Sequence, residues 1–248
     1  EGICFGTLSS GYSNTDQYTA LQITEIRAWG NLKLGNEGSY FSGCQNLVIT
    51  AHDKLDLSGT DNFYSFFKNC GKLEYPGIAQ WDTSRVTDMS YMFYWAENFD
   101  EDISAWDTGN VRNMAFMFCY AESFNADIGA WDTANVVSMK SMFRNSGFNQ
   151  DLNMWNVSKV QSMAEMFDSS PFNGQISDWD TSSVTDMAYM FASSPFNQEI
   201  SRWDTSKVVS TVNMFAKSSF NGNIGSWNTS SLQTMSYMFH TTRVFNQA

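Results

Sequence analysis

A thirteen-residue motif recurs along most of this chain and constrains its fold more than any other feature. "WDTSRVTDMSYMF" spans Trp81 to Phe93, and "WDTGNVRNMAFMF" begins twenty-five residues later. Successive copies are spaced by 25 or 24 residues, and a Phe stands twelve residues after each Trp. The Trp residues of the seven clear copies are Trp81, Trp106, Trp131, Trp155, Trp179, Trp203 and Trp227. A fixed period of this length is typical of proteins whose repeat units stack on one another.

Two weaker copies precede the clear ones. Phe67 and Phe41 continue the Phe register backwards, with Leu55-Asp56 and Trp29 in the Trp-Asp position. His52 falls in the second copy at the position usually held by Ile, and we interpret it as a residue of the N-terminal cap. The first two units are thus degenerate, as terminal repeats often are.

These registers divide the chain into two parts. Residues 1–22 form an N-terminal cap or processed end, without the basic and apolar pattern of a signal peptide. Residues 23–248 form a repeat region of about nine units, degenerate over 23–73 and regular over 74–248.

Each regular unit has two halves with different patterns. The first, as in "FNADIGAWD" (Phe124–Asp132), has the composition of a short strand that ends in a turn. The second carries Val184, Met187, Met190 and Phe191 at spacings that place them on one face of a helix. The pattern therefore predicts an α/β solenoid of stacked 24–26-residue units, with parallel short strands on one face and short helices on the other.

The repeat resembles that of the BspA-like leucine-rich-repeat surface proteins. Their unit is close to "FNQxIxxWDTSxVTxMxxMF", and the segment Ile23–Leu47 also looks like the entry unit of that family. The resemblance covers about nine tenths of the chain. It implies a leucine-rich-repeat-like solenoid, secreted or on the cell surface, used for adhesion or protein interaction. It carries over no catalytic residues.

Composition and motifs argue against several classes of function. The net charge is −12 and there is no basic run, which argues against a nucleic-acid partner. No apolar run reaches the roughly 18 residues of a membrane span. His52 and His240 lie far apart, and neither has metal-binding spacing. We therefore expect no catalytic, cofactor-binding or metal residues, and no enzyme.

The Trp residues form a column, for which we expect core packing. Exposed Trp would instead make a carbohydrate-binding platform. The Thr after each Trp-Asp could order water on an ice-binding face, although its place in a turn argues against this. These Thr residues are Thr83, Thr108, Thr133, Thr181, Thr205 and Thr229.

An acidic column follows the Trp column, since Asp comes next in five units and Asn156 and Asn228 in two others. Carboxylates stacked this closely repel one another unless they are compensated. An Asx turn within each "DTS" would do so, and Ca²⁺ bridging is the alternative. The acidic residues are Asp82, Asp107, Asp132, Asp180 and Asp204.

Cysteines and sequons are the remaining candidates for modification. Cys44 and Cys70 occupy equal positions in adjacent units, so they either form a disulfide or remain buried thiols. Cys4 could staple the N-terminal cap. Asn156 and Asn228 each begin an N-glycosylation sequon, which matters if the protein is secreted by a eukaryote.

Together with these patterns, the resemblance implies a non-enzymatic extracellular or cell-surface repeat protein for adhesion or protein interaction, with a protein or surface glycan as partner. The final letters "FNQA" open a further unit, and an exposed unit face would allow head-to-tail assembly into a filament. A filament protein is therefore the alternative, and a carbohydrate- or ice-surface binder a minor one.

Overall fold

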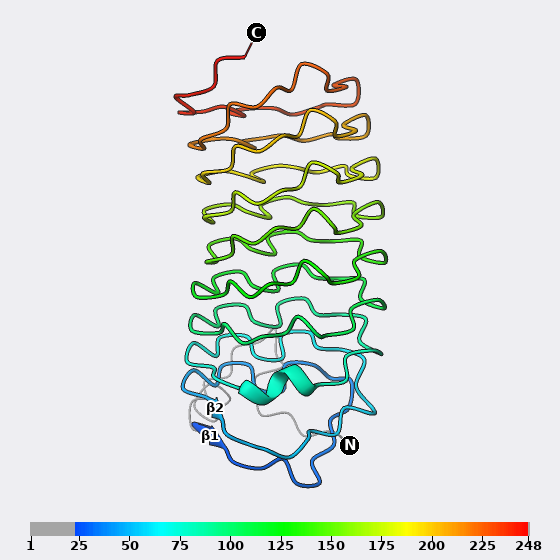
Figure 1. The fold of residues 1–248 in the computed structure, drawn as a ribbon, viewed down its shortest axis with the longest axis vertical. Helices are drawn as coiled ribbons and strands as arrows, with labels where there is room; N and C mark the ends of the chain where they lie inside the picture. Colours follow the sequence, from blue (N-terminus) through cyan, green and yellow to red (C-terminus); the bar gives the residue numbers. More distant parts are fainter. Residues whose placement is uncertain (1–22, 248) are drawn as a thin grey trace.

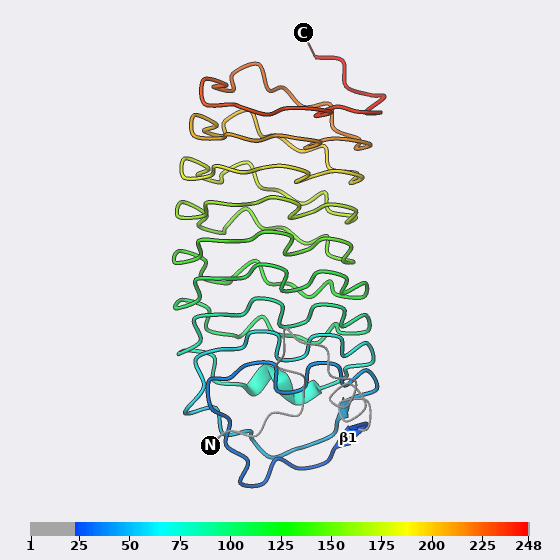
Figure 2. The ribbon, with the colours of Figure 1, turned by 180° about the vertical axis from the view of Figure 1, so that it is seen from behind.

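The computed structural model describes residues 23–247, which wind into coils stacked along the long axis of the molecule (Figure 1). The view from behind shows the same stack, with the coils in sequence order from one end to the other (Figure 2). Each coil holds one repeat unit and takes that unit's number, so that coil 2 contains Phe67 and coil 3 contains Phe93.

Regular secondary structure is confined to the N-terminal coils. Strands β1 (Glu25–Ile26) and β2 (Val48–Ile49) pair in parallel, with Glu25 opposite Val48. The 3₁₀ helix η1 (Pro76–Gln80) begins with a Pro, whose fixed φ suits the first position of a helix. It is the one helix within residues 23–247.

Isolated parallel β-bridges join the remaining coils. One series of bridges lies in the second half of each unit, at the residue just before the first Met position, and two further bridges, Lys33–Asp56 and Val48–Glu74, join the N-terminal coils. From coil 2 to coil 9 the bridged residues are Asn62, Asp88, Asn113, Ser138, Ser162, Asp186, Ser210 and Thr234. The backbone ladder of this stack therefore runs through the half in which the sequence pattern predicts helices.

The short helices expected from the Val-Met-Met-Phe spacing are absent from these segments, which are turns instead. In these segments, every second backbone N–H group donates to a carbonyl of the next coil. The N–H groups between them donate to carbonyls three residues earlier in the same coil and so close turns. In coil 7 the inter-coil bonds join the N–H groups of Met187, Tyr189 and Phe191 to the carbonyls of Ser210, Val212 and Met214. An α-helix would use these N–H groups internally and would leave the coils unjoined.

The turns need backbone in the left-handed region. Each regular coil has two non-glycine residues with positive φ, such as Tyr189 at 57° and Ser193 at 54°. This conformation costs about 1–2 kcal/mol for most residues, and Asn tolerates it best. Asn69 and Asn145 occupy such positions.

From coil 4 onward, the first half of each unit, where the pattern predicts strands, has no β-bridge. Side chains join the coils there instead. The N–H of Asn149 donates to the side-chain oxygen of Asn125, and that of Asn173 to Asn149. The hydroxyl of Thr181 donates to the carbonyl of Asp204 in the next coil. Apart from backbone bonds such as that from Leu152 N–H to the carbonyl of Gln175, this half is therefore held by hydrogen bonds that only particular side chains can make.

Aromatic columns fill the interior. Phe143 stacks between Phe118 and Phe167, with ring centroids 5.7 and 5.6 Å away. The Trp column is buried beside it, and Trp131 is 3% exposed. Thr83, Thr108, Thr133, Thr181 and Thr205 are buried as well. The buried Trp residues therefore present no sugar platform, and these Thr residues present no flat array to ice.

Replacing Phe143 by Ala should lower the free energy of unfolding by about 3–5 kcal/mol, because a rigid column cannot close the cavity. Urea denaturation measures the change. The control is Met154→Ala at a side chain that is 86% exposed, which should change stability by less than about 0.5 kcal/mol. Equal effects of the two substitutions would contradict the inward columns.

Candidate functional site

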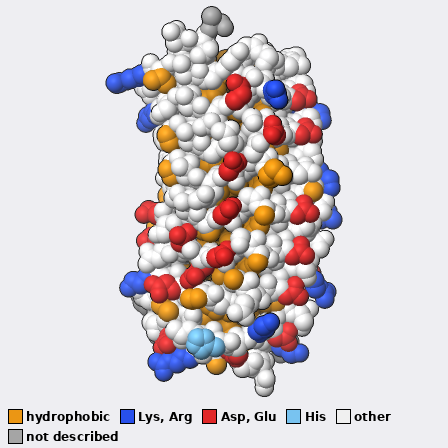
Figure 3. Space-filling view, viewed as in Figure 1, with side chains coloured by type: hydrophobic (Ala, Val, Ile, Leu, Met, Phe, Trp, Pro, Cys, Tyr) orange, Lys and Arg blue, Asp and Glu red, His pale blue; other side chains and the backbone are white. Residues whose placement is uncertain are grey.

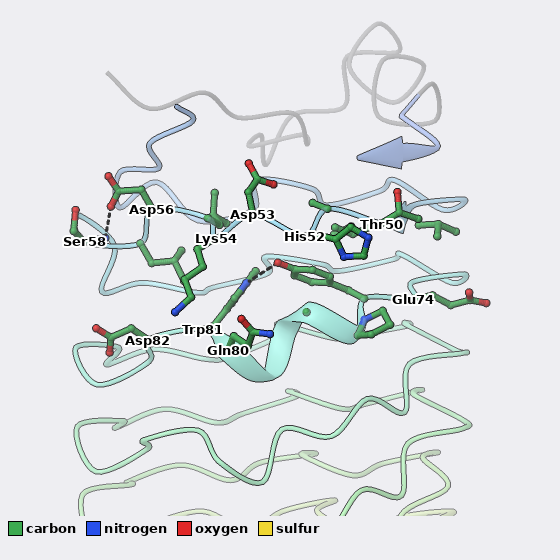
Figure 4. Close-up of a pocket in the computed structure, with 18 residues that line it drawn as sticks. Thr50, His52, Asp53, Lys54, Asp56, Ser58, Glu74, Gln80, Trp81 and Asp82 are labelled. Atoms are coloured by element: carbon green, nitrogen blue, oxygen red, sulfur yellow. Dashed lines mark hydrogen bonds between the residues drawn. The ribbon is translucent and has the colours of Figure 1, made fainter. Parts of the chain in front are cut away.

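A cleft of about 730 Å³ lies beside coils 2 and 3 (Figure 4). Residues 48–58 form one wall, and residues 74–77 and 80–82, which include most of η1, form the other. The size lies within the range of small-molecule sites, about 300–1,000 Å³.

The cleft lies where the Trp column is interrupted. Coil 2 has Leu55 in the Trp position, so the indoles of Trp29 and Trp81 have no indole between them. Tyr75 occupies the gap, with its ring centroid 5.9 Å from each of the two indoles. Its hydroxyl accepts hydrogen bonds from Trp29 Nε1 at 3.0 Å and Trp81 Nε1 at 3.3 Å. One tyrosine thus replaces the packing and the hydrogen-bond acceptor of a missing Trp unit.

Four polar side chains of the cleft have no hydrogen bond or ion pair within residues 23–247: His52, Lys54, Glu74 and Gln80. All four are exposed, and Glu74 points away from the space beside Trp81 (Figure 4). Figure 4 shows Lys54 from coil 2 and Gln80 from η1 reaching toward the space beside Trp81, with His52 farther along the same wall. A cation, an imidazole and an amide therefore face one recess and are available to a ligand.

Two carboxylates of the cleft, Asp53 and Asp56, are already engaged. Asp53 accepts the backbone N–H groups of Trp29 and Gly30 at 2.7–3.0 Å, and these bonds hold the pKa of Asp53 below its usual value. Asp56 pairs with Lys33 at 3.3 Å and accepts the N–H of Ser58. Asp53 and Asp56 thus hold the loop of residues 48–58 in place, while Lys54, His52 and Gln80 remain free to contact a ligand.

The Asp column forms Asx turns on an exposed face. Asp82 accepts the N–H and hydroxyl of Ser84, which lower its pKa, and Asp204 is held in the same way by Ser206. Figure 3 shows acidic side chains recurring along this side of the molecule. Asn156 and Asn228 accept from Ser158 and Ser230 in the same manner. The same bonds recur at Asp107, Asp132 and Asp180.

Both sequon asparagines are exposed. Within residues 23–247, no three His, Cys, Asp or Glu side chains group closely enough to hold a metal ion. Ca²⁺ bridging of the Asp column therefore stays a prediction, as does glycosylation.

Of the two alternatives for Cys44 and Cys70, a disulfide or buried thiols, the structure has the buried thiols. In Cys70, the Sγ donates to the carbonyl of Phe41 at 3.0 Å, and burial raises the pKa of this thiol well above the usual value. Cys119 is also buried, which raises its pKa to about 12. The role expected for Cys4 lies outside the described residues.

Sequence reasoning missed most of this cleft. The Leu55-Asp56 substitution marked the break in the repeat, but the pattern gave no sign that Tyr75 fills it. His52, interpreted as a cap residue, lines the recess. Lys54 and Gln80 sit at positions outside the repeat consensus, and no motif distinguishes them.

Comparison with known proteins identifies one family. The model described as "Mycoplasma protein of unknown function, DUF285" matches residues 61–171 and again residues 145–248. Together these matches span 188 of the 248 residues. No curated protein and no solved structure matches the chain. No helix within residues 23–247 has the length and apolar character needed to cross a membrane.

Replacing Tyr75 by Phe should destabilise the chain by about 1–3 kcal/mol for each indole N–H left without an acceptor. The ring remains, so the loss reports on the hydroxyl alone. Chemical denaturation followed by Trp fluorescence measures it. Tyr189→Phe, at a 41% exposed side chain, is the control and should be neutral. A neutral Tyr75→Phe would refute the bridging role.

Proposed function

We propose that this chain, which belongs to the DUF285 family of Mycoplasma proteins of unknown function, is a non-enzymatic repeat protein of the cell exterior that binds other molecules. The finer assignment to the BspA-like leucine-rich-repeat proteins is part of this proposal and rests on the repeat motif. Its partner would be a protein or a surface glycan.

The cleft beside coils 2 and 3 is the observation that carries the proposal. A binding site needs a preformed recess with apolar walls and a few polar groups that converge on it. Leu55, Leu57 and Trp81 provide apolar wall, and the side chains of Lys54 and Gln80 have no partner within residues 23–247. Groups held open in this way favour ligand binding.

The separation of inward and outward positions in each coil supports the same function. Motif residues face inward or form hydrogen bonds to neighbouring coils, so they maintain the stack. The outward positions between them vary from coil to coil, as with Ala105, Ala130 and Met154. A rigid stack with variable outer positions suits the display of a binding surface.

A head-to-tail filament is the second candidate, because the outer face of coil 9 is apolar. Met235 is 56% exposed and Tyr237 is 68% exposed. They lie on or beside a hollow of about 120 Å³ that Trp227 and Leu232 also line. If this face contacts a second copy, light scattering should give masses that rise with concentration, and Met235→Glu should abolish the rise. Monomers at all concentrations would exclude the filament.

The binding function can be tested with beads coated with the purified chain. We expect them to retain at least one component of a panel of extracellular proteins and glycans. The variant His52→Ala/Lys54→Ala/Gln80→Ala changes exposed side chains only, so it should fold normally and bind at least about tenfold more weakly. Its control carries Ala at exposed Lys159 and Lys207, far along the stack.

The outcomes separate the parts of the proposal. Binding lost only in the cleft variant supports both the function and the site. Equal binding by all three proteins places the contact elsewhere on the chain. If no component of the panel binds the wild-type chain, the adhesion function is contradicted.

A further inference from the structure

A second surface, formed by turns of coils 2 to 4, has a different character. Six aromatic side chains there touch one another in a continuous network. Tyr91 stacks on Phe116 with centroids 4.5 Å apart, and Trp95 contacts Tyr120 at 4.9 Å. We call this surface the aromatic edge, and its members are Tyr64, Tyr91, Tyr94, Trp95, Phe116 and Tyr120.

The backbone under the aromatic edge is poorly suited to large side chains. Tyr91, Trp95, Phe116 and Tyr120 have φ of 58°, 58°, 60° and 61°. Bulky residues rarely adopt this left-handed conformation. The equivalent positions of the flanking coils hold small or tolerant residues: Ser65, Asn69, Ser141 and Asn145. The coil therefore does not require aromatic rings here, and such outliers point to a function.

The edge also offers hydrogen-bond donors. Trp95 is 43% exposed and Tyr64 is 40% exposed. The hydroxyls of Tyr64, Tyr91 and Tyr120 make no hydrogen bond to any part of residues 23–247. Exposed, rigid aromatic groups with free polar tips are characteristic of interface hot spots.

The negative charge beside the aromatic edge favours a partner with basic side chains. Glu97 and Glu122, each two residues beyond Trp95 and Tyr120, are exposed and form no ion pair within the described chain. Three nearby cations contact rings or carboxylates of the described chain, while exposed Lys72 has no ion pair within residues 23–247. Lys68 lies 5.3 Å from the ring centroids of both Tyr91 and Tyr94.

Two other cations border the edge. Lys140 lies 5.9 Å from the ring of Phe116. Arg144 pairs with Glu165 at 2.6 Å and with Asp168 at 3.1 Å. The unpaired charges beside the edge are therefore two carboxylates, Glu97 and Glu122, against one cation, Lys72, in a chain of net charge −12.

We propose that the aromatic edge binds a basic, proline-rich protein segment in the polyproline II conformation. Such segments dock on aromatic-lined surfaces, and their carbonyls are free to accept hydrogen bonds. Their geometry also matches the stack. A turn of three residues rises about 9.3 Å, and two coils at β-sheet spacing span about 9.6 Å. Equivalent faces of the segment would thus meet rings on every second coil.

This inference names one partner class and rests on the proposed binding function, but it uses a surface separate from the cleft. The test is a titration of the full chain with a synthetic peptide, a run of prolines flanked by arginines, followed by calorimetry. We expect saturable binding. A peptide with the arginines replaced by aspartates should bind at least about tenfold more weakly.

The decisive variant is Trp95→Asn/Tyr120→Asn, which installs the residue found at the same position in the coils on both sides, Asn69 and Asn145. Because Asn tolerates positive φ, the variant should fold and melt no lower than the wild type. It should lose peptide binding by about tenfold or more. Tyr189→Asn, also at a positive φ but outside the edge, is the control and should bind like the wild type.

Wild-type binding that persists in Trp95→Asn/Tyr120→Asn would overturn the proposal. So would the absence of peptide binding at millimolar concentration, or retention of an anionic glycan at the edge in place of the peptide. The cleft variant should bind the peptide normally. A chain that retains other components of the panel while ignoring the peptide refutes this inference alone and leaves the broader function standing.

Discussion

The hydrogen bond that each indole of the Trp column from Trp106 to Trp227 donates to the coil before it is the interaction on which this stack depends. Trp155 Nε1 donates to the carbonyl of Ile128 at 3.0 Å, and Trp179 Nε1 donates to Leu152 at 2.9 Å. Both groups are buried, so either one alone would carry a desolvation penalty. The indole thus fills the interior and fixes the register of two coils at once. The same bond recurs from Trp106, Trp131, Trp203 and Trp227.

This bond explains why the motif tolerates so little change at Trp. From coil 4 onward the first half of each unit has no β-bridge, so the indole, the Asn amides and the Thr hydroxyls make most of the bonds between coils there. Where the Trp is missing, in coil 2, another residue must supply both the ring and the polar partner. Tyr75, in the first half of coil 3, supplies both the ring and the hydrogen-bond acceptor, and the cleft lies beside it. The candidate site is therefore a consequence of one interruption in a regular pattern.

The sequence predicted some of this architecture and not the rest. Period and apolar spacing identified the residues that face inward, because burial depends on pattern alone: Val184, Met187 and Phe191 are fully buried. The same spacing suggested helices that do not form, because a helix and a series of turns can bury the same positions. What separates them is the destination of the backbone N–H groups, which composition does not encode. The cleft and the aromatic edge depend on single departures from the repeat, such as Leu55 and Trp95, whose effects need coordinates.

Inward and outward residues thus have different tasks: the repeated letters build a stack, and the exceptions create surfaces for binding. The central claim is that the indole N–H groups join neighbouring coils. Hydrogen exchange of the indole N–H protons by NMR tests it most directly. The account predicts slow exchange for the buried indoles from Trp81 to Trp203 and fast exchange for Trp95, which is 43% exposed. Fast exchange at every indole, in a chain that is otherwise folded, would contradict it.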